Sequence, residues 1–420
     1  MAGSSVACLN RDRHPGKPII AADRTRPSPN RTGQPVGSSA EKPTVAVLGA
    51  TGTVGQLFVA SCAAAGLARL RLGVRDPAAE RAAAASLAGH EVRAVDLWNP
   101  ASLSELLHGA ALLVNCLGPA YRTRGRIASA ALASQVPYLD PNGDDAMHLR
   151  IGQALRGQPV TVAVVTGAGS VPGAFGLLAR WLAGGLPEPV RAVSGYVVTI
   201  EPIHAGTAAE FLLGVLDRRA NAASWHGGRK LTEPEPVRVA IRLPYVACAL
   251  DAYPYLTSEM ERAAADLGLR DAAFYHAFES GGTVLRCLES IAGRSQRDTI
   301  RELAGELTET VNLSMRQRAP LHLLAIEARS DSRVRSVIMR AASSYQLTAS
   351  LAALGAREII TRRIGPGLSR ADVLPPALVT ELPGTDRRTQ LEVSDSTLKH
   401  WASAQTPSAG RSRTASGPPR

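Results

Sequence analysis

Long apolar runs are missing from this chain of 420 residues. A membrane-spanning helix needs about 18 or more consecutive apolar residues. The longest apolar stretch, near 110–118, contains Asn115 and stops at Pro119. The first forty residues lack a positively charged start followed by a continuous apolar segment, and we find no lipidation motif. We therefore expect a cytoplasmic protein without a membrane span.

Cysteine and lysine are both scarce. The five cysteines are scattered without a C-x-x-C pair, at positions 8, 62, 116, 248 and 287. This spacing argues against a disulfide framework and against a metal site. The four lysines are Lys17, Lys42, Lys230 and Lys399. None follows a tyrosine in the pattern Y-x-x-x-K, which excludes the tyrosine–lysine mechanism of short-chain dehydrogenases.

Most of the formal charge of +11 lies at the two ends of the chain. Residues 1–42 carry seven Lys/Arg against three Asp/Glu, and residues 384–420 carry six against three. Both ends are rich in Pro, Gly, Ser and Thr, a composition that cannot bury enough surface to offset the entropy of ordering. We predict that they are disordered basic tails. Binding of a tail to an anionic surface is the alternative, and we expect no nucleic-acid partner.

Between the tails, the pattern predicts an α/β protein with an N-terminal doubly wound parallel sheet and a second, mixed α+β domain. Six short apolar runs alternate with helical segments, at 44–49, 69–74, 91–96, 111–116, 136–140 and 160–166. We place an NADP-binding Rossmann domain at 43–168 and a substrate domain at 169–344. A segment at 345–383 is expected to return toward the Rossmann domain.

Local signals place further elements. A helix from about 52 should end at Gly66, and another should open with a capping box at 102–105. In the second domain, alternating patterns predict strands at 190–200, 237–245 and 321–329. The stretch "AAFYHAFESGG", 272–282, has a helix-like pattern with core aromatics, and 345–360 predicts a helix with small residues on its packing face.

The stretch "VAVLGATGTVGQLF", 45–58, has the strand, Gly-x-x-Gly-x-x-Gly and helix order of a phosphate cradle. The first glycine permits the turn, the second lets a pyrophosphate approach the backbone, and the third lets the helix pack on the strand. The anion would bind the amides at the positive end of the helix dipole. A turn that binds nothing is the alternative. The predicted contacts are Gly49, Thr51, Gly52, Thr53, Val54 and Gly55.

The charge after the second strand indicates which nucleotide binds. Arg75 follows Gly55 by twenty positions, where NAD enzymes usually place a carboxylate. A guanidinium suits the 2′-phosphate of NADP, although Arg75 could also be a solvated residue at the strand end. Asp96 is placed to meet the adenine edge. The loop after the fourth strand is placed to line the nicotinamide ribose, through Asn115, Cys116, Gly118 and Pro119.

These motifs resemble the saccharopine dehydrogenase-like reductases. The resemblance rests on "VAVLGATGTVG", on "GVRD", and on "LLVNCLGPAYRTRGRIASAALASQVPYLDPNGDD". It continues with "GAGSVPGAFGLLARWLA", similar to the family's crossover into the substrate domain, and with looser motifs up to residue 383. The resemblance implies an NAD(P)H-dependent reductase whose mixed-sheet domain carries the substrate cleft. The chain departs from the family at Pro141, Asn142 and Asp144, where threonines and a glutamate are common.

A reductase must also deliver a proton after hydride transfer. The catalytic candidates are Tyr121, Asp140 and His204. Tyr121 could instead cover the cofactor edge, Asp140 could fix its loop through backbone amides, and His204 could be a capping or surface residue. The substrate-binding candidates are Tyr121, Asp144, Ser170 and Pro172.

The sequence thus favours an NADPH-dependent reductase of an imine, carbonyl or activated C=C in a small or carrier-bound metabolite, as in secondary metabolism. No basic dicarboxylate-binding set matches, so saccharopine itself is not the expected substrate. A trans-acting enoyl reductase of lipid or polyketide chains is one alternative. Another is a non-enzymatic NmrA-like sensor of NADP, although a full second domain argues against it. A homodimer is possible.

Overall fold

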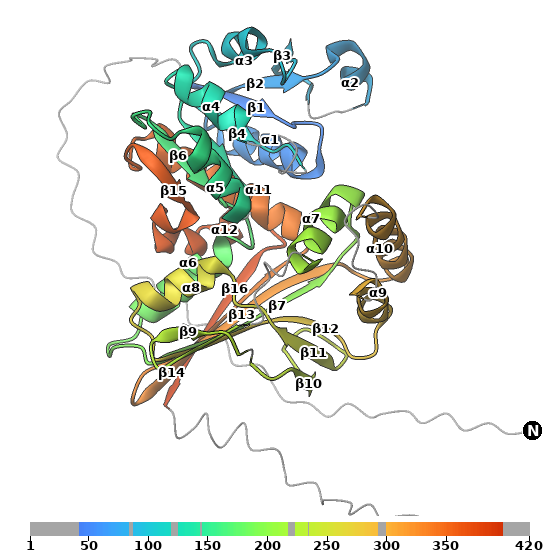
Figure 1. The fold of residues 1–420 in the computed structure, drawn as a ribbon, viewed down its shortest axis with the longest axis vertical. Coiled ribbons are helices and arrows are strands. Elements are labelled where there is room, and N and C mark those ends of the chain that lie inside the picture. The colour runs from blue at the N-terminus through green and yellow to red at the C-terminus, as the bar shows by residue number, and fades with distance from the viewer. Residues whose placement is uncertain are drawn as a thin grey trace, which may run out of the picture. The chain divides into compact units, whose positions relative to one another are not determined.

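Two β-sheets organise the chain in the computed structural model (Figure 1). The structure describes residues 42–83, 87–118, 125–142, 145–216, 223–233, 235–292 and 300–397. Residues from Lys42 onward cluster as one compact unit that holds both sheets. The predicted α/β class, with a doubly wound parallel sheet and a second mixed sheet, is confirmed.

The first sheet has seven strands in the order β15-β6-β5-β4-β1-β2-β3, and all neighbouring strands are parallel. They are β1 (Thr44–Leu48), β2 (Arg69–Val74), β3 (Glu91–Ala94), β4 (Leu112–Asn115), β5 (Tyr138–Asp140), β6 (Ala163–Thr166) and β15 (Gly367–Arg370). Every residue of β1 and β4 is buried, which explains the uninterrupted apolar runs. The strand order reverses between β1 and β4, and such a switch point opens a crevice at the carboxyl ends of the strands.

Helices cover this sheet, namely α1 (Thr53–Ala65), α2 (Pro77–Ala83), α3 (Pro100–Leu107), α4 (Arg126–Ala133) and α5 (Asp145–Ala154). As predicted, α1 ends at Gly66, which adopts a left-handed conformation with φ of 57°. The predicted capping box at 102–105 is wrong. Asn99 is the N-cap, and its side chain accepts a hydrogen bond from the Ala101 amide. Ser102 already lies inside the helix, and its hydroxyl accepts from the Asp96 amide instead.

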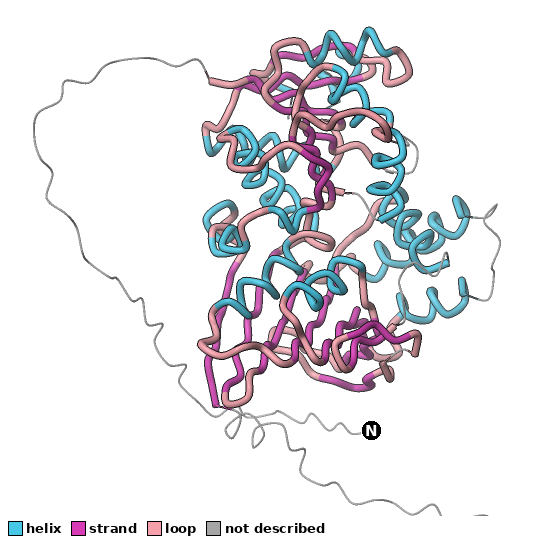
Figure 2. Tube along the Cα trace, turned by 60° about the vertical axis from the view of Figure 1, so that its left-hand side comes forward, coloured by secondary structure: helices cyan, strands magenta, loops and turns pink. Residues whose placement is uncertain are grey.

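The second sheet is mixed and follows the order β10-β11-β12-β7-β13-β14-β16, with β8 paired to β12 and β9 paired to β8. Figure 2 shows the strands of both sheets in magenta among the helices in cyan. The strands are β7 (Ala192–Ile200), β8 (Ser224–His226), β9 (Arg229–Leu231), β10 (Arg238–Ile241), β11 (Leu250–Pro254), β12 (Asp271–Glu279), β13 (Leu321–Arg329), β14 (Arg333–Ala341) and β16 (Gln390–Thr397). The strand expected at 237–245 is shorter than predicted. The helix-like interpretation of 272–282 is wrong, because these residues form most of β12 and pair with β7 and β11.

Two groups of helices accompany the second sheet. α6 (Ala174–Gly184) packs on β13 and β14, and α8 (Ser258–Asp266) contacts α6. α7 (Ala205–Leu216), α9 (Thr283–Ala292) and α10 (Ile300–Ser314) form a separate group, seen on the right of Figure 1. α10 packs against both α7 and α9.

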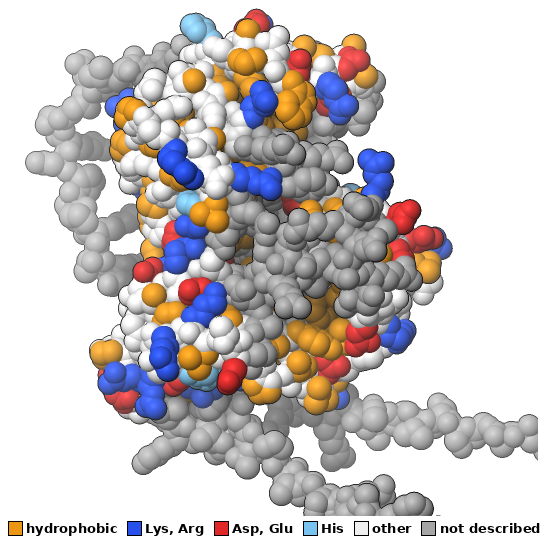
Figure 3. All heavy atoms as spheres, in the orientation of Figure 1, with side chains coloured by type: hydrophobic (Ala, Val, Ile, Leu, Met, Phe, Trp, Pro, Cys, Tyr) orange, Lys and Arg blue, Asp and Glu red, His pale blue; other side chains and the backbone are white. Residues whose placement is uncertain are grey.

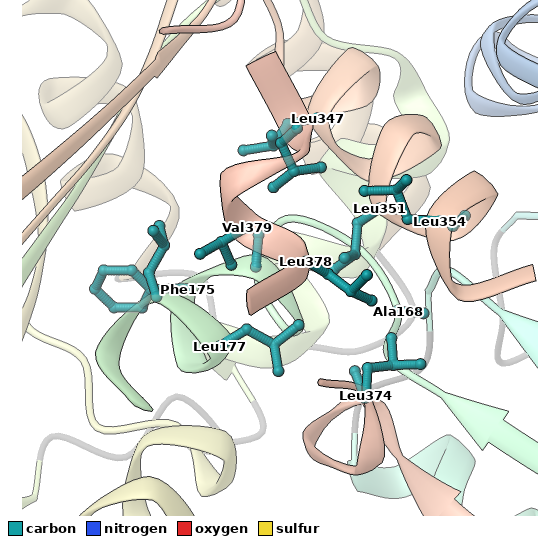
Figure 4. Packing of buried hydrophobic residues seen from close by; sticks show 14 of the residues in the cluster. Ala168, Phe175, Leu177, Leu347, Leu351, Leu354, Leu374, Leu378 and Val379 are labelled. Atoms are coloured by element: carbon teal, nitrogen blue, oxygen red, sulfur yellow. The ribbon is translucent and has the colours of Figure 1, made fainter. Parts of the chain in front are cut away.

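α11 (Ser344–Ile360) joins the two sheets into one core. It packs along α1 and also contacts β4 and β5. Figure 4 shows its leucines meeting α6 and the 3-10 turns η4 (Ala371–Val373) and η5 (Pro376–Thr380) that follow β15. The labelled residues are Ala168, Phe175, Leu177, Leu347, Leu351, Leu354, Leu374, Leu378 and Val379. The apolar contacts of α11 therefore hold the two sheets together.

The predicted C-terminal tail begins too early. After a short helix α12 (Leu382–Thr385), β16 pairs with β14 in an antiparallel register from Arg333 opposite Thr397 to Arg340 opposite Gln390. Residues 384–397 are thus part of the folded unit. Among the described residues, no helix is long and apolar enough to span a membrane. Figure 3 shows basic and acidic side chains interspersed over the described surface in view.

Candidate functional site

Close backbone packing explains two of the three glycines in the 49–55 loop. Gly49 has φ of 77°, and a Cβ there would lie 2.7 Å from the backbone carbon of Cys116. A Cβ on Gly55 would lie 2.0 Å from the carbonyl oxygen of Gly49. Only glycine lets β1, α1 and the loop after β4 approach this closely. A Cβ on Gly52 would meet only the Gly49 carbonyl oxygen, at 3.3 Å, and Gly52 is exposed.

The N-terminus of α1 has the features of an anion site. Gly52 is the N-cap, no side chain caps the helix, and the first turn holds no acidic residue. The first amides of a helix have no acceptor within the helix, and the helix dipole favours negative charge there. Thr51, Gly52, Thr53 and Val54 line the adjoining cleft. This end of the domain fits the pyrophosphate of a dinucleotide.

The end of β2 carries an exposed arginine whose backbone amide is bound by a carboxylate. Arg75 is exposed, in line with its predicted role. Sequence reasoning missed Glu80 of α2, whose Oε1 accepts from the Arg75 amide at 3.0 Å and whose Oε2 accepts from Thr51 Oγ1 at 3.0 Å. Glu80 follows Arg75 by five residues, so its acidic side chain just beyond the strand end could have been recognised in the sequence as a candidate contact. Its carboxylate joins β2 to the glycine loop.

Asp96 lies at the end of β3 and shapes the turn into α3. Its Oδ1 accepts from the Trp98 amide at 2.8 Å, and its own amide donates to Ser102 Oγ. The neighbouring Trp98 side chain is 65% exposed and lies beneath the Arg126 guanidinium. The predicted contact of Asp96 with adenine stays a prediction.

A buried polar network lies at the carboxyl ends of β4 and β5. Asp140 Oδ2 accepts from Asn115 Nδ2 at 3.0 Å and from the Tyr138 hydroxyl at 2.7 Å, while Oδ1 accepts from the Asn142 amide at 2.9 Å. Burial raises the pKa of Asp140 to about 7, although these three donors lower it. Asp140 and Asn115 do not line the cleft, whereas the next residues in each loop, Pro141 and Cys116, do. Asp140 is thus placed to hold the loops that face the cleft.

One cleft of about 1670 Å³ extends from the glycine loop to the second sheet. The loops after β4 and β5 line it, and so does the crossover 167–172. The floor on the second sheet includes Thr199, His276 and His322. Of the predicted residues, the structure brings the following to this cleft: Thr51, Gly52, Thr53, Val54, Cys116, Gly118, Ser170, Pro172 and His204. Pro119, Tyr121 and Asp144 lie outside the described residues.

His204 connects the glycine loop to α7. Its Nε2 lies 2.8 Å from Thr53 Oγ1, and its ring contacts that of Tyr345. The Tyr345 hydroxyl in turn donates to Thr207 Oγ1 at 3.0 Å. His204 is exposed and precedes α7 by one residue. It is therefore placed at the border between the nucleotide loop and the second sheet.

Ser170 lies in the crossover between the sheets and contacts a histidine that sequence reasoning missed. Its Oγ lies 2.7 Å from His322 Nε2, and its amide donates to Thr348 Oγ1 of α11 at 3.0 Å. His322 Nδ1 lies 3.0 Å from Thr199 Oγ1. Burial, with a smaller contribution from nearby His276, lowers the pKa of His322 to about 3. The alternation of "LHLLAIEAR" could have placed His322 on the buried face.

Two buried carboxylates cap helices at the cleft. Glu259 Oε1 accepts from the Gly173 and Gly176 amides at the start of α6, at 2.6 and 3.1 Å, and burial raises the pKa of Glu259 to about 7. Glu201 accepts from the amide and hydroxyl of Ser344 at the start of α11, and burial raises its pKa as well. Favourable helix dipoles and amide donors account for the burial of these acidic groups. Both are used to hold helices that frame the cleft.

A branch of the cleft is apolar. It lies among α7, α9 and α10 and reaches the ring of His276, whose pKa burial lowers to about 4. We call it the apolar branch and define it by Phe211, Val284, Leu288, Ile300, Leu307, Val311 and Met315. Of the four described arginines that line the whole cleft, Arg262 is paired with Asp372 and Arg318 with Glu279. The branch therefore offers mainly hydrocarbon contacts.

Together, the strand order and the uncapped helix behind the glycine turn define a Rossmann-type dinucleotide-binding protein. Residues 45–161 match the sequence model of the saccharopine dehydrogenase NADP binding domain. The fold is similar to apo histidine-tagged saccharopine dehydrogenase (L-Glu forming) from Saccharomyces cerevisiae, with a TM-score of 0.60 at 14% identity, over 84% of this chain and 100% of that one. It is also similar to GenD2 from gentamicin A biosynthesis, in complex with NAD, with a TM-score of 0.41 at 12% identity, over 87% and 99%. No curated protein matches by sequence.

Residues 45–161 thus form a saccharopine dehydrogenase-type NADP binding domain. The resemblance inferred from the motifs is thus confirmed, and the cofactor assigned to the domain is NADP. The glycine loop and the exposed arginine at the end of β2 fit this cofactor. The individual contacts of Arg75, Asp96, Asn115 and the loop after β4 stay predictions.

Proposed function

We propose that this protein is an NADPH-dependent reductase of an imine, carbonyl or activated C=C whose substrate carries an apolar chain. The carrying observation is a single cleft that is lined at one end by the glycine loop and at the other by the floor of a second sheet. A nucleotide held by Gly52 and the first amides of α1 would enter this same cleft. When bound, NADPH supplies the hydride.

The residues of the first sheet would hold the nucleotide by charge and shape. The α1 amides would bind the pyrophosphate, and Arg75 the 2′-phosphate. Gly118 is exposed at the cleft and leaves space there, since no described residue beyond its chain neighbours comes within 4 Å of a Cβ built on it. His204, through Thr53, would keep the second sheet close to the phosphate loop. These roles concern binding and orientation.

The apolar branch favours one alternative, an enoyl reductase that acts on lipid or polyketide chains. It fits such a chain better than it fits a small polar substrate. Its helices α7, α9 and α10 present leucine, isoleucine, valine and phenylalanine side chains to the cleft. Burial of a methylene group contributes about 0.8 kcal/mol, or up to about fourfold in affinity. Two of the arginines that line the cleft, Arg262 and Arg318, are each paired with a carboxylate, which favours an apolar chain over a dicarboxylate at that end. Whether a carrier protein presents the chain is a separate prediction.

Two measurements test this proposal. Nicotinamide fluorescence titrations should give tighter binding of NADPH than of NADH. NADPH oxidation should then be followed with trans-2-enoyl thioesters of four to twelve carbons, with medium-chain aldehydes, and with a 2-oxo acid plus an amine. We expect kcat/KM to rise with chain length among the acceptors that react.

A matched pair of variants tests whether the apolar chain of the substrate binds in the apolar branch. Val311→Phe fills the branch and should raise KM for the longest acceptor more than for the shortest. Leu313→Phe, on the same helix but 59% exposed, is the control. Equal effects of the two variants, or kcat/KM independent of chain length, would contradict the apolar-chain substrate.

The non-enzymatic sensor remains the second hypothesis. It predicts NADPH binding without oxidation by any acceptor class in the series. Binding of NADPH would then persist in Val311→Phe, because Val311 belongs to the apolar branch and not to the glycine loop.

The homodimer and the cytoplasmic location expected from the sequence also stay predictions. Sedimentation would test the first, and cell fractionation would test the second.

A further inference from the structure

Three hydroxyl and imidazole groups form a chain of hydrogen bonds between the crossover and the second sheet. Ser170 Oγ lies 2.7 Å from His322 Nε2, and His322 Nδ1 lies 3.0 Å from Thr199 Oγ1. The three residues come from the loop after β6, from β13 and from β7. All three line the cleft.

The second sheet sets the geometry of this chain. His322 and Thr199 are directly paired in the antiparallel register of β13 and β7, so their side chains lie on the same face. Ser170 and His322 are 4% and 2% exposed, whereas Thr199 is partly exposed. Water in the cleft can thus reach the threonine end, while the imidazole is enclosed.

Because burial lowers the pKa of His322 to about 3, the ring is neutral at neutral pH. His276 of β12, which faces the same cleft, is neutral there as well, since burial lowers its pKa to about 4. A neutral imidazole has one nitrogen that donates and one that accepts. Such a ring, placed between two hydroxyls, can accept a proton at one nitrogen while it releases one from the other.

We propose that Ser170 is the proton donor of the reduction and that His322 and Thr199 are the relay that restores its proton. This inference rests on the proposed function and names residues for its second half, the protonation that must follow hydride transfer. It differs from the sequence-based candidates, since Asp140 lies behind the loops that line the cleft and His204 is joined to the glycine loop.

The proton transfers balance without a net charge on the protein. The Ser170 O–H bond breaks and its proton passes to the substrate atom that has become electron-rich. The His322 Nε2–H proton moves to Ser170 Oγ, and the Thr199 hydroxyl proton moves to His322 Nδ1. Thr199 regains a proton from water in the cleft, which leaves a hydroxide ion. The relay resets when the Nδ1 proton returns through Thr199 to that hydroxide, the Ser170 hydroxyl proton passes to Nε2, and cleft water reprotonates Ser170; the hydroxide formed in this last step leaves for solvent.

A purely structural role for the Ser170–His322 bond makes different predictions. In that case the bond would only anchor the crossover to β13, as the Ser170 amide anchors it to Thr348. Loss of the hydroxyl at Thr199 would then matter little, because that hydroxyl bonds the Nδ1 of His322 and not the Nε2 that faces Ser170. The relay instead requires Thr199 to carry a hydroxyl.

The kinetic test uses the full chain and the best acceptor from the thioester and aldehyde series. Ser170→Ala should lower kcat about 10²- to 10⁴-fold, the range for loss of a general acid, with little change in the NADPH dissociation constant. His322→Gln and Thr199→Val should lower kcat and reduce the solvent deuterium isotope effect, whereas Thr199→Ser should restore both. His226→Gln, an ion-paired histidine on β8, is the histidine control.

A second measurement does not depend on turnover. Nitrogen-15 NMR of histidine-labelled full chain should show His322 neutral from pH 5 to 9, with tautomer populations that shift in Thr199→Val and in Ser170→Ala. A protonated His322 at pH 7, or a tautomer unmoved by both variants, would overturn the relay. So would full kcat in Ser170→Ala or in Thr199→Val. If no acceptor oxidises NADPH, the proposed function fails, and the tautomer measurement still decides whether the relay exists.

Discussion

At the residue scale, the pair formed by Arg75 and Glu80 is expected to set the cofactor preference. Arg75→Ala should weaken NADPH binding about tenfold or more and leave NADH nearly unchanged, because only NADPH carries a 2′-phosphate. Glu80→Gln should strengthen NADPH binding several-fold by removing a negative charge beside that phosphate. The measurement is a fluorescence titration with both nucleotides.

Arg93→Ala is the control for this prediction. Arg93 is an exposed arginine of the neighbouring strand β3 and forms an ion pair with Glu91. If Arg75→Ala weakened NADH as much as NADPH, the side chain would contribute to stability or to adenine binding rather than to recognition of the phosphate.

Asp140 predicts a specific pH dependence of stability. Its pKa is raised from an ordinary value of 3.8 to about 7, so between pH 4 and 7 the folded state holds a proton that the unfolded state has lost. The free energy of unfolding contributed by this group therefore falls as pH rises through that window, and the loss is complete above pH 7. Asp140→Asn removes the titration. Wild type should lose stability relative to this variant between pH 5 and 8.

Urea unfolding of wild type and of Asp140→Asn at pH 5 and at pH 8 measures this difference in the free energy of unfolding. Glu259 and Glu201, whose pKa values burial also raises, remain in both proteins and cancel in the comparison. A stability difference between wild type and Asp140→Asn that is the same at pH 5 and pH 8 would show that Asp140 is ionised throughout.

At the scale of elements, only one of the three glycines in the turn between β1 and α1, Gly52, should tolerate an added methyl group without loss of the fold. Gly55→Ala places a Cβ 2.0 Å from the Gly49 carbonyl oxygen, and overpacking of this kind costs about 1–3 kcal/mol. Gly52→Ala should keep the fold but weaken NADPH binding, since it narrows the approach to the α1 amides. Thermal unfolding and nucleotide titration separate the two effects.

Gly184→Ala provides the comparison for both glycine variants. Gly184 is the last residue of α6, and apart from its own helix no part of the described chain lies within 4 Å of its added Cβ. Alanine should be neutral or slightly stabilising there, because it has the higher helix propensity. A loss of stability in Gly184→Ala equal to that in Gly55→Ala would mean that the close contact with Gly49 is not the cause.

The success of the element predictions depended on how each strand is covered. The buried strands β1 and β4 carry apolar runs, and β2 alternates arginine with leucine before Gly73, so each agrees with its prediction to within two residues. The pattern of β12 instead predicts a helix because both of its faces are covered: Tyr275 packs in one apolar cluster while His276 meets aromatic rings in the cleft. When both faces are apolar, periodicity cannot distinguish a strand from a helix.

At the scale of the whole molecule, we expect β16 to be the last element that the fold needs. A chain trimmed to residues 42–397 should keep its Tm and its NADPH affinity, whereas a chain that ends at 389 should unfold at a lower temperature. The reason is that β16 contributes an antiparallel ladder along β14. Thermal unfolding of both trimmed chains tests this, and equal Tm values would show that β16 adds nothing to the sheet.

The sequence alone determined six of the seven strands of the Rossmann sheet, the glycine loop and the NADP-binding domain, since these follow from periodicity and from turn chemistry within about thirty residues. Only the tertiary structure decided which distant groups meet in the cleft. Thr53 contacts His204 across 151 positions, and Ser170 contacts His322 across 152. The physical reason is that such contacts depend on strand order and on the packing of α11 between the sheets, which no local pattern encodes.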